Sequence, residues 1–244
     1  MGILRMPGLG TLVNMVAIVF GGTLGMLFGS RLSEKIQESL MVACGVCVLF
    51  IGLVGTASEM LVLEAEKFSV HGSMMLIICF VLGIAIGEFV GIEELFEKFG
   101  IWLKKKSGSE NDTGFLDAFV SSSLVVCIGA MAVVGAIEDG LQGDITMLEA
   151  KAMLDAVIIM VMAVSMGKGC IFSAIPVGIL QGSVTALAVW LKPLMTAAAL
   201  SNISLVGSVM ICCVGINLVF GKKVRVANTL PALVLAVAWA ALGI

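Results

Sequence analysis

An aspartate and a lysine stand one helical turn apart inside an apolar stretch of the chain. Asp155 lies within the run Met153–Val164, and Lys151 precedes it by four residues. A charge at bilayer depth costs roughly 3 kcal/mol or more, so such residues usually face a bundle interior or a water-filled cavity. One interpretation is therefore a cation or proton site on Asp155. The alternative, equally open at this stage, is an interfacial ion pair of i,i+4 spacing near the outer headgroups.

Four carboxamides also lie inside apolar runs, namely Asn14, Gln181, Asn217 and Asn228. A carboxamide in a membrane helix can bridge to a neighbouring helix, typically for less than about 2 kcal/mol, or it can coordinate a ligand. Bridging is the favoured interpretation. Asn217 and Asn228 flank the short basic turn Gly221–Arg225. We expect these two to tie the last two helices together.

The stretch from Ser165 to Gly182 concentrates glycine, serine and proline at membrane depth. Gly167 and Gly169 flank Lys168, and Ser173 comes three residues before Pro176, which has no backbone donor. Broken helices in transporters place such backbone beside a binding site. The segment Gly167–Pro176 is therefore either a discontinuous helix or a tight turn followed by a kinked helix.

The remaining candidates for chemistry have simpler explanations. Asp117 begins an apolar run, so a first-turn acid stabilised by the helix dipole is favoured over a place in a polar path. Glu138 and Asp139 are expected at a solvated helix end. With one histidine, and seven cysteines all in or beside apolar runs, the sequence predicts no metal site and no cofactor. No catalytic motif is present, so we do not expect an enzyme.

Composition places these residues in a membrane protein. The 244 residues are 60% hydrophobic and 13% charged, with a mean hydropathy of +1.16. A membrane helix needs about 20 mostly apolar residues. The sequence therefore predicts an all-α bundle of about eight spans in one membrane domain over residues 1–244, or seven if the sixth is broken. The predicted spans are 9–29, 38–58, 72–92, 115–137, 147–166, 170–191, 203–220 and 226–243.

The basic residues orient these spans by the positive-inside rule. The predicted inner side carries Arg31, Lys35, Lys98, Lys104, Lys105, Lys106, Lys168, Lys222, Lys223 and Arg225. The predicted outer side carries Arg5, Lys67, Lys151 and Lys192, which completes the 14 basic residues, and its connections, including Glu66, are acidic. We expect both termini on the outer side of the membrane. The net charge of −3 argues against a nucleic-acid partner.

Glycine at every fourth position predicts where helices approach closely. The first span carries Gly21, Gly25 and Gly29, and the third carries Gly83, Gly87 and Gly91. The helices that follow share the pattern Ser-Leu-x-Val-x-x-Gly, ending at Gly45 and Gly129. The first and second hairpins could therefore be a parallel duplication, or the likeness could be chance among glycine-rich apolar segments.

Taken together, these segments resemble a known family. Gly10–Asn14, Cys127–Leu141, Lys151–Asp155, Phe172–Ala174 and Asn228–Ala232 are similar to the uncharacterised bacterial membrane proteins of the YqgA and YdfK type, domain-of-unknown-function family 554. The resemblance spans nearly the whole chain. It implies a bacterial inner-membrane protein, often guessed to be a transporter, and draws attention to Asn14, Lys151, Asp155, Ser173 and Asn228.

The favoured function is a permease or channel for an ion or small solute. Its polar path would use Asp155, Lys151, Ser173, Gln181, Asn14, Asn217, Asn228 and Asp117. Besides the bilayer and the solute, the expected partner is a second copy of the chain in a homo-oligomer. The alternative is a structural or accessory subunit whose polar residues only bridge helices. The first requires water to reach the path, and the second requires a dry core with every carboxamide paired.

Overall fold

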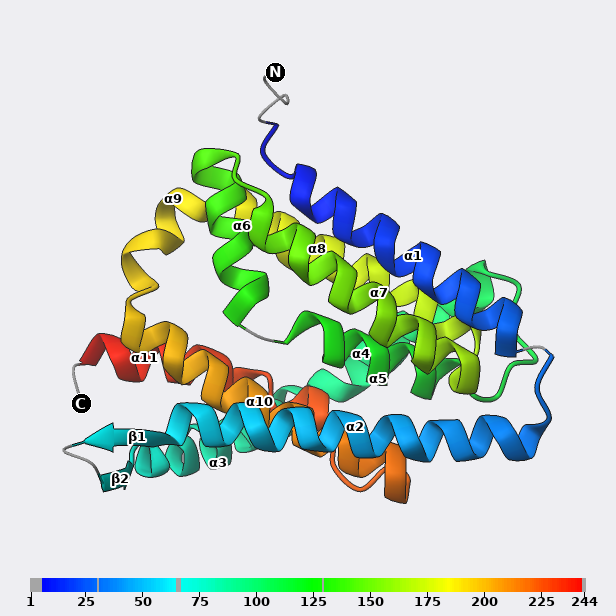
Figure 1. Cartoon of the computed structure of the whole chain (residues 1–244), viewed down its shortest axis with the longest axis horizontal. Coiled ribbons are helices and arrows are strands. Elements are labelled where there is room, and N and C mark those ends of the chain that lie inside the picture. The colour runs from blue at the N-terminus through cyan, green and yellow to red at the C-terminus, as the bar shows by residue number, and fades with distance from the viewer. Residues whose placement is uncertain (1–5, 30, 65–66, 129, 243–244) are drawn as a thin grey trace. The chain divides into compact units, whose positions relative to one another are not determined.

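The structure, a computed structural model, describes residues 6–29, 31–64, 67–128 and 130–242. Arg5, Glu66 and Gly129, which the sequence predictions use, lie outside these ranges. Helices dominate, which confirms the all-α prediction (Figure 1). The α-helices are α1 Leu9–Gly29, α2 Glu34–Met60, α3 Ser73–Val90, α4 Ile92–Lys106, α5 Phe115–Cys127, α6 Ala130–Gln142, α7 Thr146–Met166, α8 Ala174–Ala186, α9 Ala188–Leu191, α10 Ala197–Phe220 and α11 Pro231–Leu242. The 3-10 helices are η1 Lys168–Ser173, η2 Lys192–Leu194 and η3 Val226–Thr229, and the strands are β1 Leu61–Glu64 and β2 Lys67–Val70.

The chain divides into two compact units. Unit 1 comprises Met1–Cys44, Glu97–Cys127 and Met131–Lys192. Unit 2 comprises Gly45–Phe96, Ile128–Ala130 and Pro193–Ile244. The sequence prediction of a single membrane domain stays a prediction.

Among the described residues, five helical segments are long and apolar enough to cross a membrane. They are Leu9–Gly29, Lys35–Met60, Ser73–Val90, Lys168–Ala186 and Ala197–Phe220. These match the first, second, third, sixth and seventh predicted spans. The sixth is the span for which the sequence left a break open. There, η1 leads directly into α8, and the apolar stretch stays helical from Lys168 to Ala186.

The other three predicted spans differ from simple membrane helices. Residues 115–137 form two helices, α5 and α6, which bend by 63° relative to each other. The predicted span 147–166 is α7, which at 21 residues is about 31 Å long but carries Glu149, Lys151 and Asp155. The last span is a shorter apolar helix, Val226–Leu242. The predicted count of about eight spans is therefore not confirmed.

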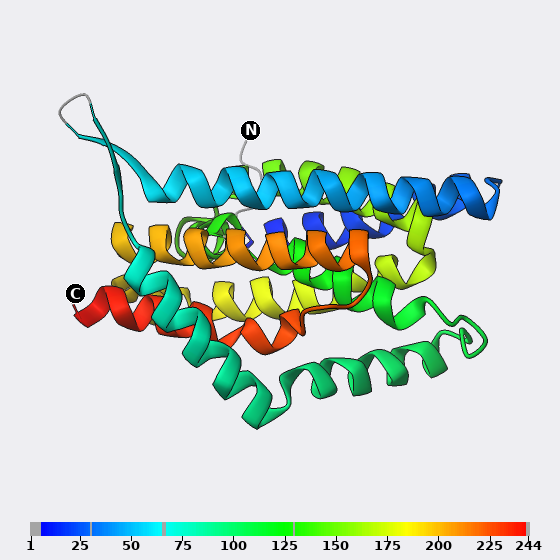
Figure 2. The same cartoon turned by 90° about the horizontal axis from the view of Figure 1, so that it is seen from below.

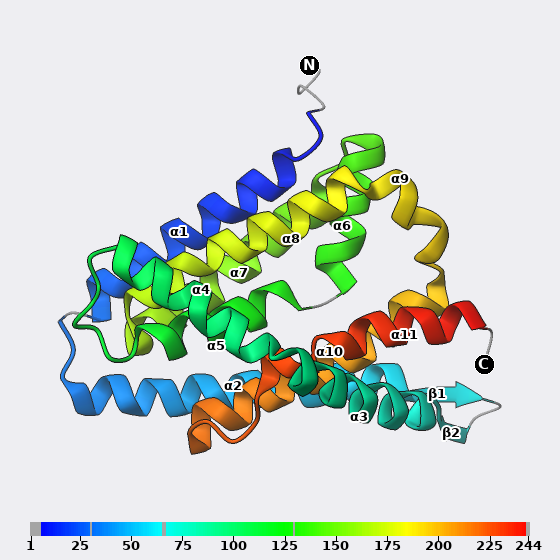
Figure 3. The ribbon, with the colours of Figure 1, turned by 180° about the vertical axis from the view of Figure 1, so that it is seen from behind.

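In unit 1, α1 lies along α7 and α8 (Figures 1 and 3). The glycines of α1 make this possible. A Cβ at Gly21, Gly25 or Gly29 would collide with the carbonyl oxygens of Ala156, Met160 and Val164 on α7. The backbones of α1 and α7 therefore pack directly, which gains dispersion contacts that do not depend on water.

In unit 2, α3 packs on η3 and α11 in the same manner. A Cβ at Gly83 would collide with Ala232, and one at Gly87 with the carbonyl oxygen of Asn228. Gly91 has a different role from the packing role predicted for it. It ends α3 with a φ of 71°, a left-handed conformation that glycine adopts without strain.

Other elements of unit 2 complete the frame around this contact. The C-terminal part of α2 lies beside α10 (Figure 2), where a Cβ at Gly52 would meet the backbone of Cys212. The strands β1 and β2 form an antiparallel hairpin, with Leu61 opposite Val70, between α2 and α3.

The two hairpins that resemble each other in sequence differ in structure. A short turn joins α1 to α2, whereas the amphipathic helix α4 stands between α3 and α5. The helices that close the predicted hairpins also differ, since α2 is one helix of 27 residues, whereas residues 115–137 are divided between α5 and α6. The parallel duplication of the two hairpins stays a prediction.

Candidate functional site

Four of the predicted path residues meet in the interior of unit 1. We call Asn14, Lys151, Asp155 and Gln181 the central polar cluster; they come from α1, α7 and α8, and none is more than 7% exposed. The Lys151 ammonium lies 2.8 and 2.7 Å from the two carboxylate oxygens of Asp155. Asn14 Nδ2 donates to Asp155 Oδ2 at 3.0 Å and to Gln181 Oε1 at 3.4 Å.

Lys151 also binds the C-terminal end of α5. Its Nζ donates to the carbonyl oxygen of Val126 at 2.8 Å. Val126 is the penultimate residue of α5, so this carbonyl is one of those that a helix leaves without an internal partner at its C-terminus. A cation there also complements the negative end of the helix dipole. The bent pair in this region is therefore α5–α6, whereas the sequence left open a discontinuous helix or a tight turn at Gly167–Pro176.

The chemistry of the cluster fixes which atom donates and which accepts in each hydrogen bond. The carboxylate of Asp155 only accepts, so the side chain of Asn14 must present its amide nitrogen to it. The same nitrogen then requires Gln181 to present its oxygen. This order leaves Asn14 Oδ1 and Gln181 Nε2 without a partner among the described residues. The cluster thus ends in one free acceptor and one free donor.

The stretch from Ser165 to Gly182 is a turn followed by a helix. Gly167 ends α7 with a φ of 82°, which favours glycine, and η1 follows at once. Ser173 is fully buried and donates to the carbonyl oxygen of Cys170 at 2.7 Å. Pro176 lies in the first turn of α8, where no backbone donor is needed. Ser173 is the last residue of η1 and lies about 12 Å along the helical axis before Gln181 of α8, and it is not bonded to the cluster.

Asp139 corrects the expectation of a solvated helix end. Its side chain is completely buried in unit 1 and accepts hydrogen bonds from the backbone of Gly8 and Gly10, each at 3.1 Å. It therefore caps the N-terminus of α1, where the helix dipole favours a negative charge. A Cβ at Gly10 would collide with Leu148, so glycine is needed for this approach.

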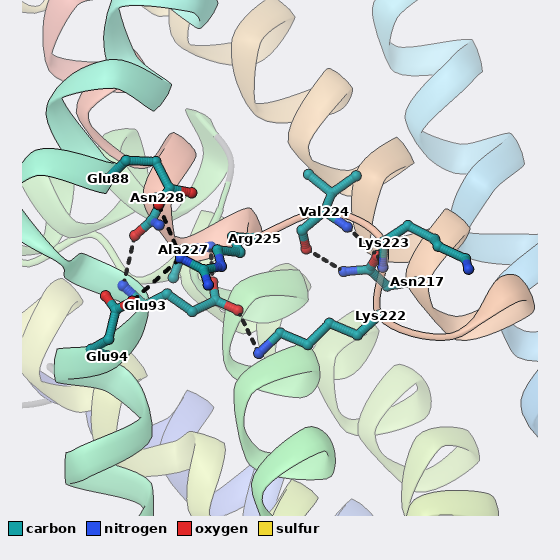
Figure 4. Close-up of polar contacts among 10 residues, drawn as sticks. All are labelled: Glu88, Glu93, Glu94, Asn217, Lys222, Lys223, Val224, Arg225, Ala227 and Asn228. Carbon is teal, nitrogen blue, oxygen red and sulfur yellow. Dashed lines mark hydrogen bonds and ion pairs between the residues drawn. The ribbon is translucent and has the colours of Figure 1, made fainter.

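A second buried arrangement lies in unit 2, where two helix starts cap each other (Figure 4). Asn228 Oδ1 accepts from the backbone nitrogen of Glu93 at 2.7 Å, at the start of α4. The carboxylate of Glu93 in turn accepts from the backbone nitrogen of Ala227 at 3.0 Å, in η3. Both side chains are almost fully buried. Asn228 therefore bridges helix ends, but it joins η3 to α4, whereas the sequence analysis expected it to tie the last two helices together.

Charged residues surround this reciprocal cap in Figure 4. Lys222 lies 2.9 Å from Glu93, and Arg225 lies 3.0 Å from Glu88 and 3.4 Å from Glu94. Asn217 holds the turn after α10, because it donates to the carbonyl oxygen of Val224 at 2.7 Å and accepts from the backbone of Lys223 and Val224. These contacts stabilise the connection from α10 to η3.

Not every predicted path residue reaches the cluster. Asn217 and Asn228 belong to unit 2, and Asp117 is exposed in the first turn of α5.

Three buried polar residues were not identified from the sequence. They are Thr11, Thr185 and Glu93. Nothing in the neighbouring sequence distinguishes them from polar residues at the surface. No group of three or more metal-ligating side chains was found within the described part of the chain.

The comparisons with known proteins decide the family. The family described as "Protein of unknown function (DUF554)" matches residues 9–241. The chain belongs to this family. The DUF554 match includes the whole central polar cluster and both partners of the reciprocal cap. The resemblance inferred from sequence segments is thereby confirmed.

Two relatives cover nearly the full length of this DUF554 chain. One is "Uncharacterized membrane protein YdfK" of Bacillus subtilis, 26% identical over 226 residues, which are 93% of each chain. The other is "Uncharacterized protein YqgA" of Escherichia coli, 28% identical over 241 residues, which are 96% of this chain and 98% of the relative. No solved structure matches significantly. A membrane protein of unknown function is what these relatives support.

Proposed function

We propose that this DUF554 protein is a permease or channel for an ion or small solute, with its path through the central polar cluster. The observation that carries the proposal is the cluster itself, since it brings four buried polar side chains from three helices to the end of a broken helix. Half-helix ends beside intramembrane polar residues are where transporters bind their substrates.

The accessory alternative makes a different demand on the same residues. It requires every carboxamide inside the bundle to be paired, as the half-buried Asn217 is. Asn14 Oδ1 and Gln181 Nε2 have no partner within the described residues. Because an unpaired buried polar group costs roughly 1–3 kcal/mol, a purely structural cluster gains nothing from keeping them. Asn228 Nδ2 in the reciprocal cap is likewise unpaired among the described residues, so what favours a path is that two such atoms meet beside the buried ion pair.

The same proposal includes the placement of the chain in the membrane and its assembly with further copies. The chain is a multi-pass protein of the bacterial inner membrane, with both termini outside, and is not an enzyme. It forms a homo-oligomer, and this requires surfaces other than the faces of Gly21, Gly25, Gly83 and Gly87, because these are occupied inside each unit. The mass of the purified protein–detergent complex tests the last point.

Solute flux into liposomes that contain the purified protein tests the function. The proposal predicts flux above that of empty liposomes, and a strong reduction in Asp155→Asn and Gln181→Ala. Asp117→Asn is the matched control, because Asp117 is exposed and remote from the cluster. If both cluster variants keep the full flux of the unmodified protein, the proposed path is wrong.

A further inference from the structure

Two helices of unit 1 face each other with polar side chains. Thr11 and Asn14 lie one turn apart on α1, and Gln181 and Thr185 lie one turn apart on α8. The helices run antiparallel, since Asn14 meets Gln181 while Gly22, further along α1, faces Ile171 in η1, before α8. We call these four residues the polar seam. Their exposed fractions are 5%, 0%, 1% and 8%.

Each residue of the polar seam has one polar atom without a partner among the described residues. The atoms are Thr11 Oγ1, Asn14 Oδ1, Gln181 Nε2 and Thr185 Oγ1. Buried polar atoms nearly always have a hydrogen-bond partner. Threonine in a helix can satisfy its hydroxyl on its own backbone, as Thr23 of α1 does by donating to the carbonyl oxygen of Val19. Thr11 and Thr185 do not.

The charges beside the polar seam cancel. Lys151 and Asp155 pair directly, and the third hydrogen of the ammonium is used by Val126. No net charge is left to replace the hydration of an ion, and an ion taken into such a site without a counter-charge is strongly disfavoured. A neutral molecule needs only hydrogen bonds in exchange for those it made with water.

We propose that the polar seam binds a small neutral molecule that both donates and accepts hydrogen bonds. This rests on the proposed transport function and names its substrate class. The molecule accepts from Gln181 Nε2 and donates to Asn14 Oδ1, and the two threonine hydroxyls, which can donate or accept, complete its shell. Water, urea and glycerol have this chemistry.

Stopped-flow light scattering of proteoliposomes under an osmotic gradient tests the substrate class. The probes are water, urea and glycerol, and K⁺ and Cl⁻ flux is followed in the same vesicles with ion-sensitive dyes. We expect at least one neutral probe to cross faster than in empty vesicles while K⁺ and Cl⁻ do not. Ion flux without neutral flux overturns this inference and leaves the transport function standing. The absence of every flux overturns both.

Matched variants locate the site. Thr11→Val and Thr185→Val remove a hydroxyl without changing side-chain shape, and we expect each to lower the neutral flux by about fivefold, the effect of one lost hydrogen bond. Thr23→Val on α1 and Ser183→Ala on α8 are the controls, because both hydroxyls are exposed and bond their own helix. Variants of Thr11 and Thr185 that retain full neutral flux and the normal unfolding temperature overturn the assignment.

Discussion

Asp155 and Lys151 form a buried ion pair in the interior of unit 1. Each is buried, and each is the other's counter-charge. The intact pair therefore adds little to the free energy of unfolding, because both charges lose their hydration. The loss of one partner, in contrast, leaves an uncompensated charge in the interior. The pair also explains how Lys151, a residue expected at the outer headgroups, sits inside the bundle.

Asp155→Asn should lower the free energy of unfolding by about 3–5 kcal/mol, because it leaves the Lys151 ammonium without a counter-charge. The double variant Lys151→Met/Asp155→Leu should recover most of this loss, since no charge remains buried. Tryptophan fluorescence during thermal unfolding in detergent measures both. A double variant as unstable as Asp155→Asn would contradict the explanation.

The reciprocal cap of unit 2 gives a second prediction for single residues. Glu93→Gln should destabilise the protein by about 1–3 kcal/mol, because the buried carboxylate loses its charge toward Lys222 and the amide of Ala227. Glu94→Gln is the control, since Glu94 is half exposed and its contact with Arg225 is long. Equal effects of the two substitutions on the unfolding temperature would refute the capping role.

Sequence alone identified part of this chemistry. Asn14, Asp155 and Gln181 are conspicuous as polar residues in apolar runs, but Asn14 is 141 and 167 residues from the other two. Which helix faces meet is a property of packing, so the cluster could not be assembled from spacing. Asp139 and Glu93 lie next to other acidic residues and glycines, a pattern typical of solvated turns. Their burial depends on helix ends that only the fold supplies.

At the scale of elements, glycine and helix breaks decide the architecture of each unit. The glycine spacing of α1 and α3 correctly predicted close helix contacts, because a missing Cβ has a direct steric consequence. The break between α5 and α6 was not predicted. Its sequence is uniformly apolar around residue 128, with neither proline nor charge to mark it. The carbonyl that the break frees is bound by Lys151, which lies on another helix.

Two alanine substitutions separate packing from helix propensity. Gly21→Ala should be destabilising, because the new methyl group collides with the carbonyl oxygen of Ala156 on α7. Gly182→Ala should be neutral or stabilising by up to about 1 kcal/mol, since a Cβ there meets no atom within 4 Å and alanine favours a helix. The unfolding temperatures of the two variants, measured beside that of the unmodified protein, test both expectations. If Gly21→Ala is harmless, α1 and α7 do not pack as described.

For the whole molecule, the family and the apolar helices support a membrane location, whereas the orientation is a prediction from the basic residues. The positive-inside rule predicts the loop 104–114 on the inner side. The loop consists of the end of α4 followed by turns, and Asn111 within it is exposed.

Labelling of Asn111→Cys tests this orientation in a variant whose seven native cysteines are replaced by alanine. A maleimide that does not cross membranes should leave this cysteine unlabelled in intact cells and label it after permeabilisation. Thr196→Cys, in the predicted outer connection before α10, is the control and should label in intact cells. Labelling of Asn111→Cys in intact cells would reverse the proposed topology.

Transport through unit 1 requires water and solute to reach the central polar cluster, and the accessibility of a thiol placed there measures whether they do. In the same cysteine-free background, Gln181→Cys is compared with Met210→Cys, because Gln181 and Met210 are 1% and 0% exposed. A small hydrophilic methanethiosulfonate reagent should modify position 181 in membranes and leave position 210 unmodified. If position 181 is as unreactive as position 210, the cluster is dry and a transport path through it is excluded.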